Sequence, residues 1–241
     1  MRVAIVAVAC VLASPAFAGP PYVTDDPEPT EYQHFEIYAF TDGTAVRGGH
    51  ESETGIDFNY GGAPDLQLST TIALTGERAA PGGEEWGVGN IEFGAKYRFL
   101  HQDDFGLDVS AYPQVFLPHL SSGVGEPHAY VFLPIWMQKD WGDWSSFGGG
   151  GCTLGAGSGA RDGCIAGWAL TRRVLPDLTL GPEIYHSTPD TRGGRASTGI
   201  GFGAIYDLSD TYHLLASYGP GIQNAAETDR MTWYAALEFT F

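Results

Sequence analysis

The sequence has no long apolar run beyond its first residues, and it is poor in basic residues and in cysteine. No stretch of about 18 apolar residues follows the N-terminus, which excludes a membrane protein built from helices. Only 12 lysines and arginines stand against 29 acidic residues, a formal net charge of −17, so nucleic acid and anionic membrane surfaces are not expected as partners. The 34 glycines disfavour an ordinary helical globule, because glycine destabilises helix interiors. An acidic β-protein rich in glycine remains.

The N-terminus has the features of a secretory signal peptide. A charged start at Arg2 precedes an apolar stretch at residues 3–12 and a small-residue cleavage site, Ala-Phe-Ala, at residues 16–18. We therefore expect residues 1–18 to be removed on export.

Two cysteines remain after this leader. Cys152 and Cys164 flank a stretch rich in glycine, serine and alanine that is typical of a hairpin loop. In an oxidising compartment such a pair predicts a disulfide. A zinc or redox site would need further cysteine or histidine ligands, which neither flank supplies, so we expect no metal and no cofactor.

Apolar and polar residues alternate along most of the chain. Met231, Trp233, Ala235, Leu237 and Phe239 alternate with more polar neighbours, and the same pattern recurs at residues 66–74 and 91–99. A period of two is typical of strands with one apolar face. Weaker versions lie at 32–42, 51–60, 106–117, 129–140, 145–154, 164–174, 177–187, 196–207 and 211–219, which makes about twelve strands in all.

Short and long connections follow one another in strict alternation. The short ones lie at 61–65, 101–104, 141–143, 175–177 and 209–210, and the long ones at 43–50, 76–85, 118–127, 155–163, 188–195 and 220–229. Short turns on one rim and long loops on the other are typical of bacterial outer-membrane barrels, whose short turns face the periplasm. We therefore predict that residues 32–241 form an all-β, antiparallel up-and-down transmembrane β-barrel of about 12 strands.

A soluble β-sandwich is the alternative, because alternation does not say whether the apolar face meets a core or lipid. The positions of large aromatic residues favour outer-membrane lipid. They gather at strand ends, where interfacial girdles lie: Trp86, Trp136, Trp141, Trp144, Tyr218 and Trp233. The terminal strand ends in Phe241 and resembles the signal that the barrel-assembly machinery recognises, so this machinery is an expected partner.

The charged residues fall on the opposite parity and are expected to line the lumen, since charge on the lipid face costs about 2–4 kcal/mol for Arg or Lys near the midplane. The candidates are Glu36, Asp57, Glu92, Lys96, Arg98, Asp108, Arg173, Glu183, Asp207 and Glu238. They would either pair across strands and support a narrow barrel, or form a constriction that filters solutes. The sequence leaves both interpretations open.

Residues 19–31 precede the first strand and contain four prolines, so this segment is expected to be extended and outside any central strand. The periplasm is its default position. Tyr22 and Val23 offer an apolar foothold for the alternative, partial insertion into the lumen.

No motif of an enzyme is present. The seven histidines are scattered, and only His186 with Ser187, and His119 with Ser121 or Ser122, place a histidine near a serine. Neighbouring residues on a strand point to opposite faces, which weakens the first pair. A membrane-embedded lipid hydrolase is therefore a third hypothesis, and no catalytic residue is predicted.

Several stretches resemble the outer-membrane protein family named for the meta pathway of phenol degradation. They are Thr24 to Pro29, Phe58 to Gln67, Gly94 to Phe99, Phe132 to Pro134, and Gly199 to Asp207. The resemblance implies a barrel in the bacterial outer membrane that takes up small, often aromatic or hydrophobic, compounds. Our hypothesis is a passive channel for such small-molecule solutes, and the alternative is a closed barrel with a structural or surface-interaction role.

Overall fold

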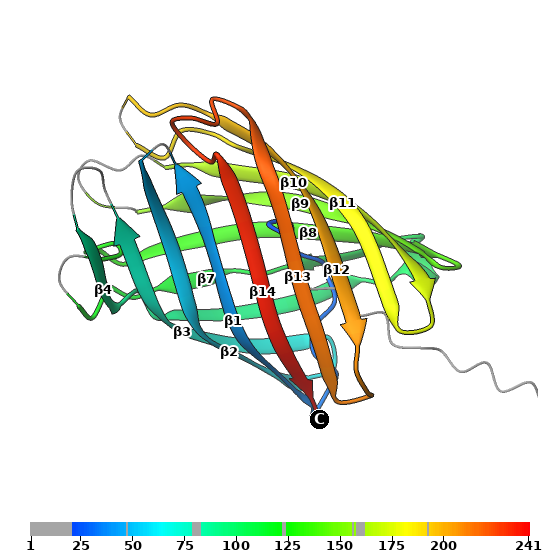
Figure 1. The fold of residues 1–241 in the computed structure, drawn as a ribbon. Coiled ribbons are helices and arrows are strands. Elements are labelled where there is room, and N and C mark those ends of the chain that lie inside the picture. Colours follow the sequence, from blue (N-terminus) through cyan, green and yellow to red (C-terminus); the bar gives the residue numbers. More distant parts are fainter. Residues whose placement is uncertain are drawn as a thin grey trace, which may run out of the picture.

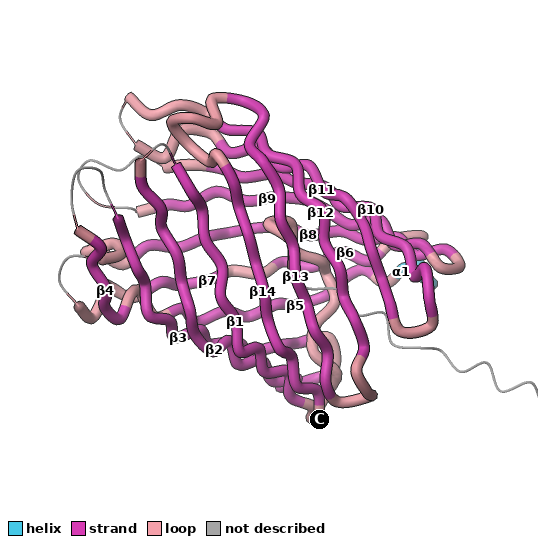
Figure 2. The backbone as a smooth tube through the Cα atoms, in the orientation of Figure 1, coloured by secondary structure: helices cyan, strands magenta, loops and turns pink. Residues whose placement is uncertain are grey.

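The structure is a computed structural model that describes residues 21–46, 48–78, 83–121, 124–155, 157, 162–191 and 193–241. The predicted signal peptide at 1–18 lies outside the described residues. Within them, the strands form one antiparallel sheet that closes on itself (Figures 1 and 2). The strands are β1 (Phe35–Val46), β2 (Gly49–Ala63), β3 (Leu66–Arg78), β4 (Glu84–Val88), β5 (Glu92–Leu100), β6 (Asp108–Ala111), β7 (Gln114–Phe116), β8 (Tyr130–Trp141), β9 (Trp144–Leu154), β10 (Cys164–Leu175), β11 (Leu178–Ser187), β12 (Ser197–Asp207), β13 (Tyr212–Gln223) and β14 (Met231–Thr240).

The fourteen strands of the described residues form twelve staves of a barrel. Strands β4 and β5 both pair with β3, so together they form one interrupted stave. Strands β6 and β7 both pair with β5 and with β8, so they form a second interrupted stave. The second interruption falls at Pro113, which has no N–H to give to the ladder. Pairing of β1 with β14, from Glu36 opposite Thr240 to Ala45 opposite Met231, closes the sheet. The prediction of a twelve-stranded up-and-down antiparallel barrel is confirmed.

The two faces of the staves have the polarity of a barrel in lipid. On β3, Leu68, Ile72 and Leu74 are exposed on the outside, whereas the alternating Gln67 and Thr75 are buried. A soluble protein has the reverse arrangement, with apolar residues inside. Outward apolar and inward polar positions are the pattern of a transmembrane barrel and argue against the sandwich.

Several predicted connections are wrong in extent. The first long loop, expected at 43–50, is almost entirely strand, because β1 continues to Val46 and β2 starts at Gly49, with these two residues in register. The ladder of hydrogen bonds continues there although the apolar alternation has ended. The turn expected at 101–104 contains a short helix, α1 (Gln102–Phe105), which ends at Gly106 with a left-handed φ of 83°. Among the described residues, no helix is long and apolar enough to cross a membrane.

The predicted disulfide is confirmed. Cys152 on β9 and Cys164 on β10 stand opposite each other in the ladder, with their Cα atoms 4.0 Å apart, and form a disulfide. The bond clamps the two staves at the base of the loop that joins them. The bond lies at the end of the two staves that is opposite their neighbouring short turns.

One residue of the predicted aromatic girdles is placed differently. Trp86, Trp141 and Tyr218 are well exposed on the outside, but Trp136 is only 3% exposed. Trp136 shares its strand face with Pro134 and Gln138, which are also buried, whereas Leu133 and Ile135 point outward. The assignment of Trp136 to a girdle is wrong, because the parity of β8 turns it into the lumen.

Candidate functional site

Residues 21–31, called the strap below, lie inside the barrel and cross its lumen (Figure 1, dark blue). The strap contacts β11, β12 and β13 at one end, β5 in the middle, and β3 near the point where it leaves the lumen to join β1. The default prediction of a strap in the periplasm is therefore wrong. The inserted alternative is found, although Tyr22 alone of the two predicted foothold residues inserts its side chain, while Val23 binds through its backbone.

Polar contacts hold the start of the strap against one wall. The Tyr22 hydroxyl donates to the carbonyl oxygen of Gly181 at 3.0 Å, and the Tyr22 ring lies edge-on to Phe147. The backbone N–H groups of Val23 and Thr24 donate to the two carboxylate oxygens of Glu183, each at 3.2 Å. Glu183 therefore acts as an acceptor for the strap backbone.

Glycines in the barrel wall make room for these strap residues. A Cβ atom on Gly203 would lie 2.6 Å from the Tyr22 ring, and one on Gly167 would lie 2.1 Å from the Thr24 hydroxyl oxygen. Both distances are below van der Waals contact. The small lumen-facing residues of β10 and β12 thus form a recess that fits the strap.

The middle of the strap is paired with a buried lysine on β5. Lys96 is 4% exposed, and its Nζ lies 3.1 Å from Asp25 Oδ1 and 3.9 Å from Asp26 Oδ1. Burial raises the pKa of Asp26 above its usual value, although the Lys96 ammonium opposes the rise. Lys96 also lies 5.0 Å from the centre of the Tyr112 ring. The lysine is therefore the main electrostatic partner of the strap.

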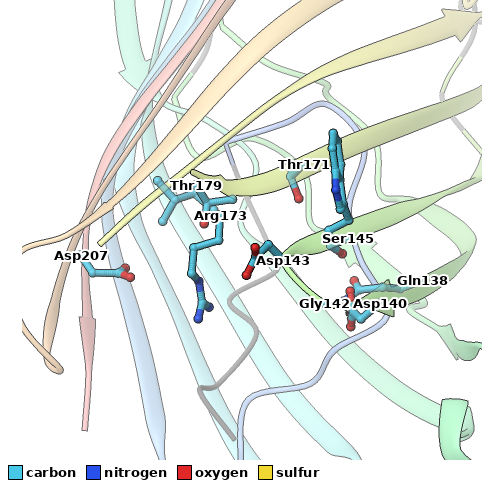
Figure 3. Close-up of a pocket in the computed structure, with 11 residues that line it drawn as sticks. Gln138, Asp140, Gly142, Asp143, Ser145, Thr171, Arg173, Thr179 and Asp207 are labelled. Atoms are coloured by element: carbon cyan, nitrogen blue, oxygen red, sulfur yellow. Dashed lines mark hydrogen bonds between the residues drawn. The ribbon is translucent and has the colours of Figure 1, made fainter. Parts of the chain in front are cut away.

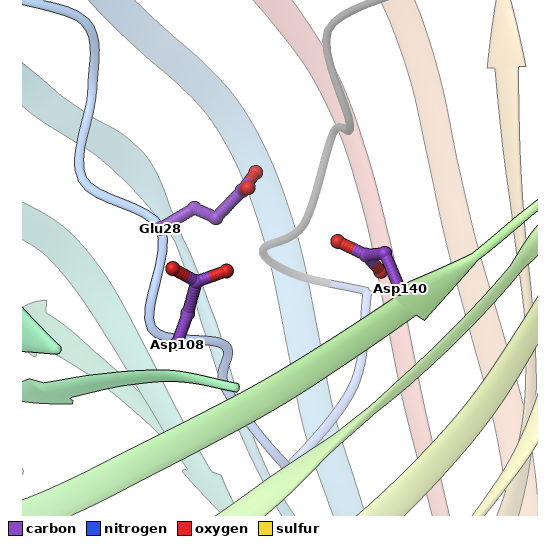
Figure 4. Close-up of side chains that lie close together, drawn as sticks. All are labelled: Glu28, Asp108 and Asp140. Atoms are coloured by element: carbon purple, nitrogen blue, oxygen red, sulfur yellow. The ribbon is translucent and has the colours of Figure 1, made fainter. Parts of the chain in front are cut away.

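The last part of the strap meets a second group of charges. Glu28 lies beside Asp108 and Asp140 (Figure 4). Arg98 Nη1 lies 3.9 Å from Glu28 and 3.8 Å from Asp108. The N–H and hydroxyl of Thr30 donate to Gln67 Oε1 on β3, at 2.9 and 3.1 Å.

Separate cavities lie along the lumen of the barrel. An inner cavity of about 400 Å³ lies at the short-turn end, where Asp143, Arg173 and Asp207 line it (Figure 3). A central cavity of about 210 Å³ lies between the strap and the wall of β1, β2, β3 and β5. An outer vestibule, two adjoining cavities of about 390 and 430 Å³, lies at the long-loop end, and both of its parts are lined by Phe116, Glu126 and Tyr130.

The ten residues predicted to line the lumen fall into separate groups. The central cavity is lined by Glu36, Asp57, Glu92 and Lys96, and the inner cavity by Arg173 and Asp207. Arg98 and Asp108 lie by the end of the strap, and Glu183 binds its backbone. Glu238 accepts a hydrogen bond from the Tyr38 hydroxyl at 3.1 Å. Sequence reasoning missed Asp25 and Asp26 as partners of Lys96. The signal in the sequence that could have indicated this pairing is an acidic N-terminal segment together with a lysine on an inward-facing strand position.

The histidines proposed for a hydrolase have other partners. His186 Nδ1 lies 2.8 Å from the Thr198 hydroxyl, and His119 Nδ1 lies 2.6 Å from the backbone carbonyl of Ser121. Ser122 lies outside the described residues. Neither contact is the serine hydroxyl to histidine contact that activates a nucleophile.

A closed barrel of twelve staves with an apolar outside and a charged lumen defines an outer-membrane, porin-like transmembrane barrel. The chain belongs to the family described as "Putative MetA-pathway of phenol degradation", whose model matches residues 14–234. The predicted family membership is thus confirmed. None of the curated proteins has a sequence that matches this chain.

Solved structures that share the fold include an outer membrane channel and two porins. An outer membrane channel from Pseudomonas putida F1 superposes with a TM-score of 0.65 at 13% identity, over 93% of this chain and 100% of that one. The KdgM porin, solved in complex with disordered oligogalacturonate, gives 0.57 at 12% identity over 86% and 99%. The NanC porin gives 0.55 at 10% identity over 85% and 98%. These likenesses show the fold.

Proposed function

We propose that this protein is a bacterial outer-membrane channel for the passive diffusion of small solutes, aromatic and hydrophobic ones among them. The observation that carries the proposal is the row of cavities within the barrel, the central one of which is lined in part by the strap. The central cavity and the outer vestibule share Thr71 and Glu92 in their linings, so the two adjoin along the lumen. Diffusion needs no cofactor and no chemistry on the solute. The fold shared with outer-membrane porins supports the location.

The lining of the central cavity favours cations and neutral solutes over anions. Glu36, Asp57 and Glu92 line it with the strap carboxylates, and Lys96 is the one basic residue among its lining residues in the described part of the chain. A lumen with lining charge of one sign raises the local concentration of the opposite ion.

Cation preference is expected to appear as a reversal potential. In planar bilayers that separate unequal KCl concentrations, the potential should report a higher permeability for K⁺ than for Cl⁻. The double variant Asp57→Asn with Glu92→Gln should bring the reversal potential towards zero. Asp103→Asn, on the exposed helix α1, removes one acidic charge outside these cavities and should leave it unchanged. Anion preference in the unmodified protein would contradict the proposed mechanism.

The wall of the outer vestibule supports aromatic solutes. Phe116 on β7 and Tyr130 on β8 stand opposite each other with ring centroids 4.4 Å apart and planes 7° apart, and Phe132 lines the same vestibule. The neighbouring Val115 and Leu133 are exposed on the outer face, so the three rings belong to the inward face. Aromatic rings stack on such surfaces.

An aromatic cation should therefore block the K⁺ current more strongly than an aliphatic cation of equal charge. Added on the long-loop side, 2-phenylethylamine is expected to reduce the current at lower concentration than butylamine. Substituting Phe116→Leu and Tyr130→Leu should remove the difference, while the aliphatic block stays. Equal block by the two amines in the unmodified barrel would count against aromatic solutes.

The closed barrel remains the second candidate, because the strap spans the lumen. Absence of conductance together with absence of liposome swelling by any small solute would favour it over the channel.

A further inference from the structure

Three carboxylates from three separate segments meet inside the barrel. Glu28 comes from the strap, Asp108 from β6 and Asp140 from β8, and one oxygen of each lies within 4.8 Å of the other two (Figure 4). We propose that these side chains, together with Gln138, bind a calcium ion that joins the strap to the barrel wall. The proposal concerns the strap and does not depend on what the barrel transports.

The spacing of the oxygens fits calcium. Oxygen ligands lie about 2.4 Å from Ca²⁺, so two ligands of one ion are at most about 4.8 Å apart. Calcium also accepts carboxylate and amide oxygens in irregular arrangements, whereas Mg²⁺ demands a smaller, nearly octahedral set. Ligands contributed by a strap and two strands are more easily brought into an irregular arrangement.

The arginine that lies within 4 Å of Glu28 and Asp108 is already engaged by another carboxylate. Arg98 donates to Asp65 from Nε at 3.2 Å and from Nη2 at 3.0 Å, but its Nη1 lies 3.9 Å from Glu28 and 3.8 Å from Asp108. The last two distances exceed a hydrogen bond. Asp108 accepts one further bond, from the backbone N–H of Gln102 at 3.0 Å. The three carboxylates therefore keep a surplus of negative charge that a divalent ion would offset.

Buried oxygen atoms without partners adjoin the carboxylates. Gln138 is 1% exposed, and its Nε2 donates to Asp140 Oδ2 at 3.0 Å, which places the side-chain amide against the cluster. Its Oε1 has no hydrogen-bond partner, and neither has Oδ1 of Asp140. Buried polar atoms nearly always have a partner, so the unpaired amide oxygen beside the three carboxylates and the unpaired oxygen of one of them point to a ligand that is a cation. Both atoms are of a type that Ca²⁺ binds.

The inner cavity gives an ion access to this position. Gln138 and Asp140 line the cavity of about 400 Å³ at the short-turn end, and Figure 3 shows the ends of the two side chains next to each other there. An ion arriving from that side reaches the wall residues first and then Glu28.

Calcium titration of the purified barrel tests the proposal. The mature chain, refolded in detergent without lipopolysaccharide and treated with EDTA, is titrated with CaCl₂ in a calorimeter. One saturable site is expected. Glu28→Gln, Asp108→Asn and Asp140→Asn should each weaken Ca²⁺ binding by about tenfold or more, and MgCl₂ should bind more weakly than CaCl₂. Asp103→Asn on α1 removes an acidic charge outside the cluster and should bind Ca²⁺ as the unmodified protein does.

A second measurement guards against misfolded variants. Glu28 belongs to the strap, so Glu28→Gln leaves every stave intact, and its heat-modifiable migration in gels should match that of the unmodified barrel. Ca²⁺ should raise the unfolding temperature of the unmodified barrel and have no such effect on Glu28→Gln. Absence of saturable Ca²⁺ binding, or equal affinity in the folded Glu28→Gln variant, would overturn the proposal.

Discussion

Removal of residues 21–30 is expected to raise the single-channel conductance several-fold. The strap crosses the lumen from the wall at Gly181 to the wall at Lys96, and its residues Tyr22, Asp25 and Glu28 line the central cavity. The staves close through the pairing of β1 with β14 without help from the strap. The deletion should therefore open the lumen while the barrel stays folded.

Two substitutions separate the effect of the strap from a general effect of mutation. Glu31→Gln changes an exposed residue at the end of the strap and should leave conductance unchanged. Gly203→Val places side-chain atoms where the Tyr22 ring lies, so it should release only the first part of the strap and give an intermediate conductance. Single-channel recordings in planar bilayers measure all three variants. A deletion variant with the conductance of the unmodified barrel would show that the strap does not restrict the channel.

The barrel wall could be predicted from the sequence because the alternation that defines each strand lies within that strand. Lipid on one side and the lumen on the other impose a period of two, which can be read along β3, β5 or β14 without knowing their partners. The disulfide was accessible for the same reason, since Cys152 and Cys164 flank one hairpin loop. Where strands continue beyond the lipid, as in β1 and β2 around residues 43–50, the alternation ends before the strand does.

The contents of the lumen could not be predicted in the same way. The strap is irregular, and its contacts join residues far apart in the sequence, such as Asp25 with Lys96 and Thr24 with Glu183. The depth of a lumen residue along the barrel axis decides which cavity it lines, and alternation carries no information on depth. The sequence therefore predicts which charged residues face the lumen but not which of them line the same cavity. The recess formed by Gly167 and Gly203 can be recognised only from the position of the strap.

Replacement of Lys96 by methionine is expected to lower the free energy of unfolding by about 3 kcal/mol or more, as is typical when one partner of a buried ion pair is removed. Methionine keeps the volume and the apolar stem of lysine but not its charge. Asp25 and Asp26 would then face Glu36 and Asp57 across the central cavity without the ammonium group that lies between them. The strap should leave its position in this variant, because repulsion replaces its main attraction.

Neutralising Asp25 and Asp26 should restore most of the stability that the Lys96→Met substitution removes. In Lys96→Met combined with Asp25→Asn and Asp26→Asn, the unpaired charges are gone, so most of the lost stability is expected to return. Guanidinium unfolding of the detergent-solubilised barrel measures the free energies, and single-channel recordings report the strap, since Lys96→Met should resemble the deletion in conductance. Lys96→Arg, which keeps the charge, should stay near the unmodified barrel in both. If Lys96→Met were as stable as the unmodified barrel and equally narrow, the strap would be held by the recess at Tyr22 and the contacts of Glu183, not by the buried lysine.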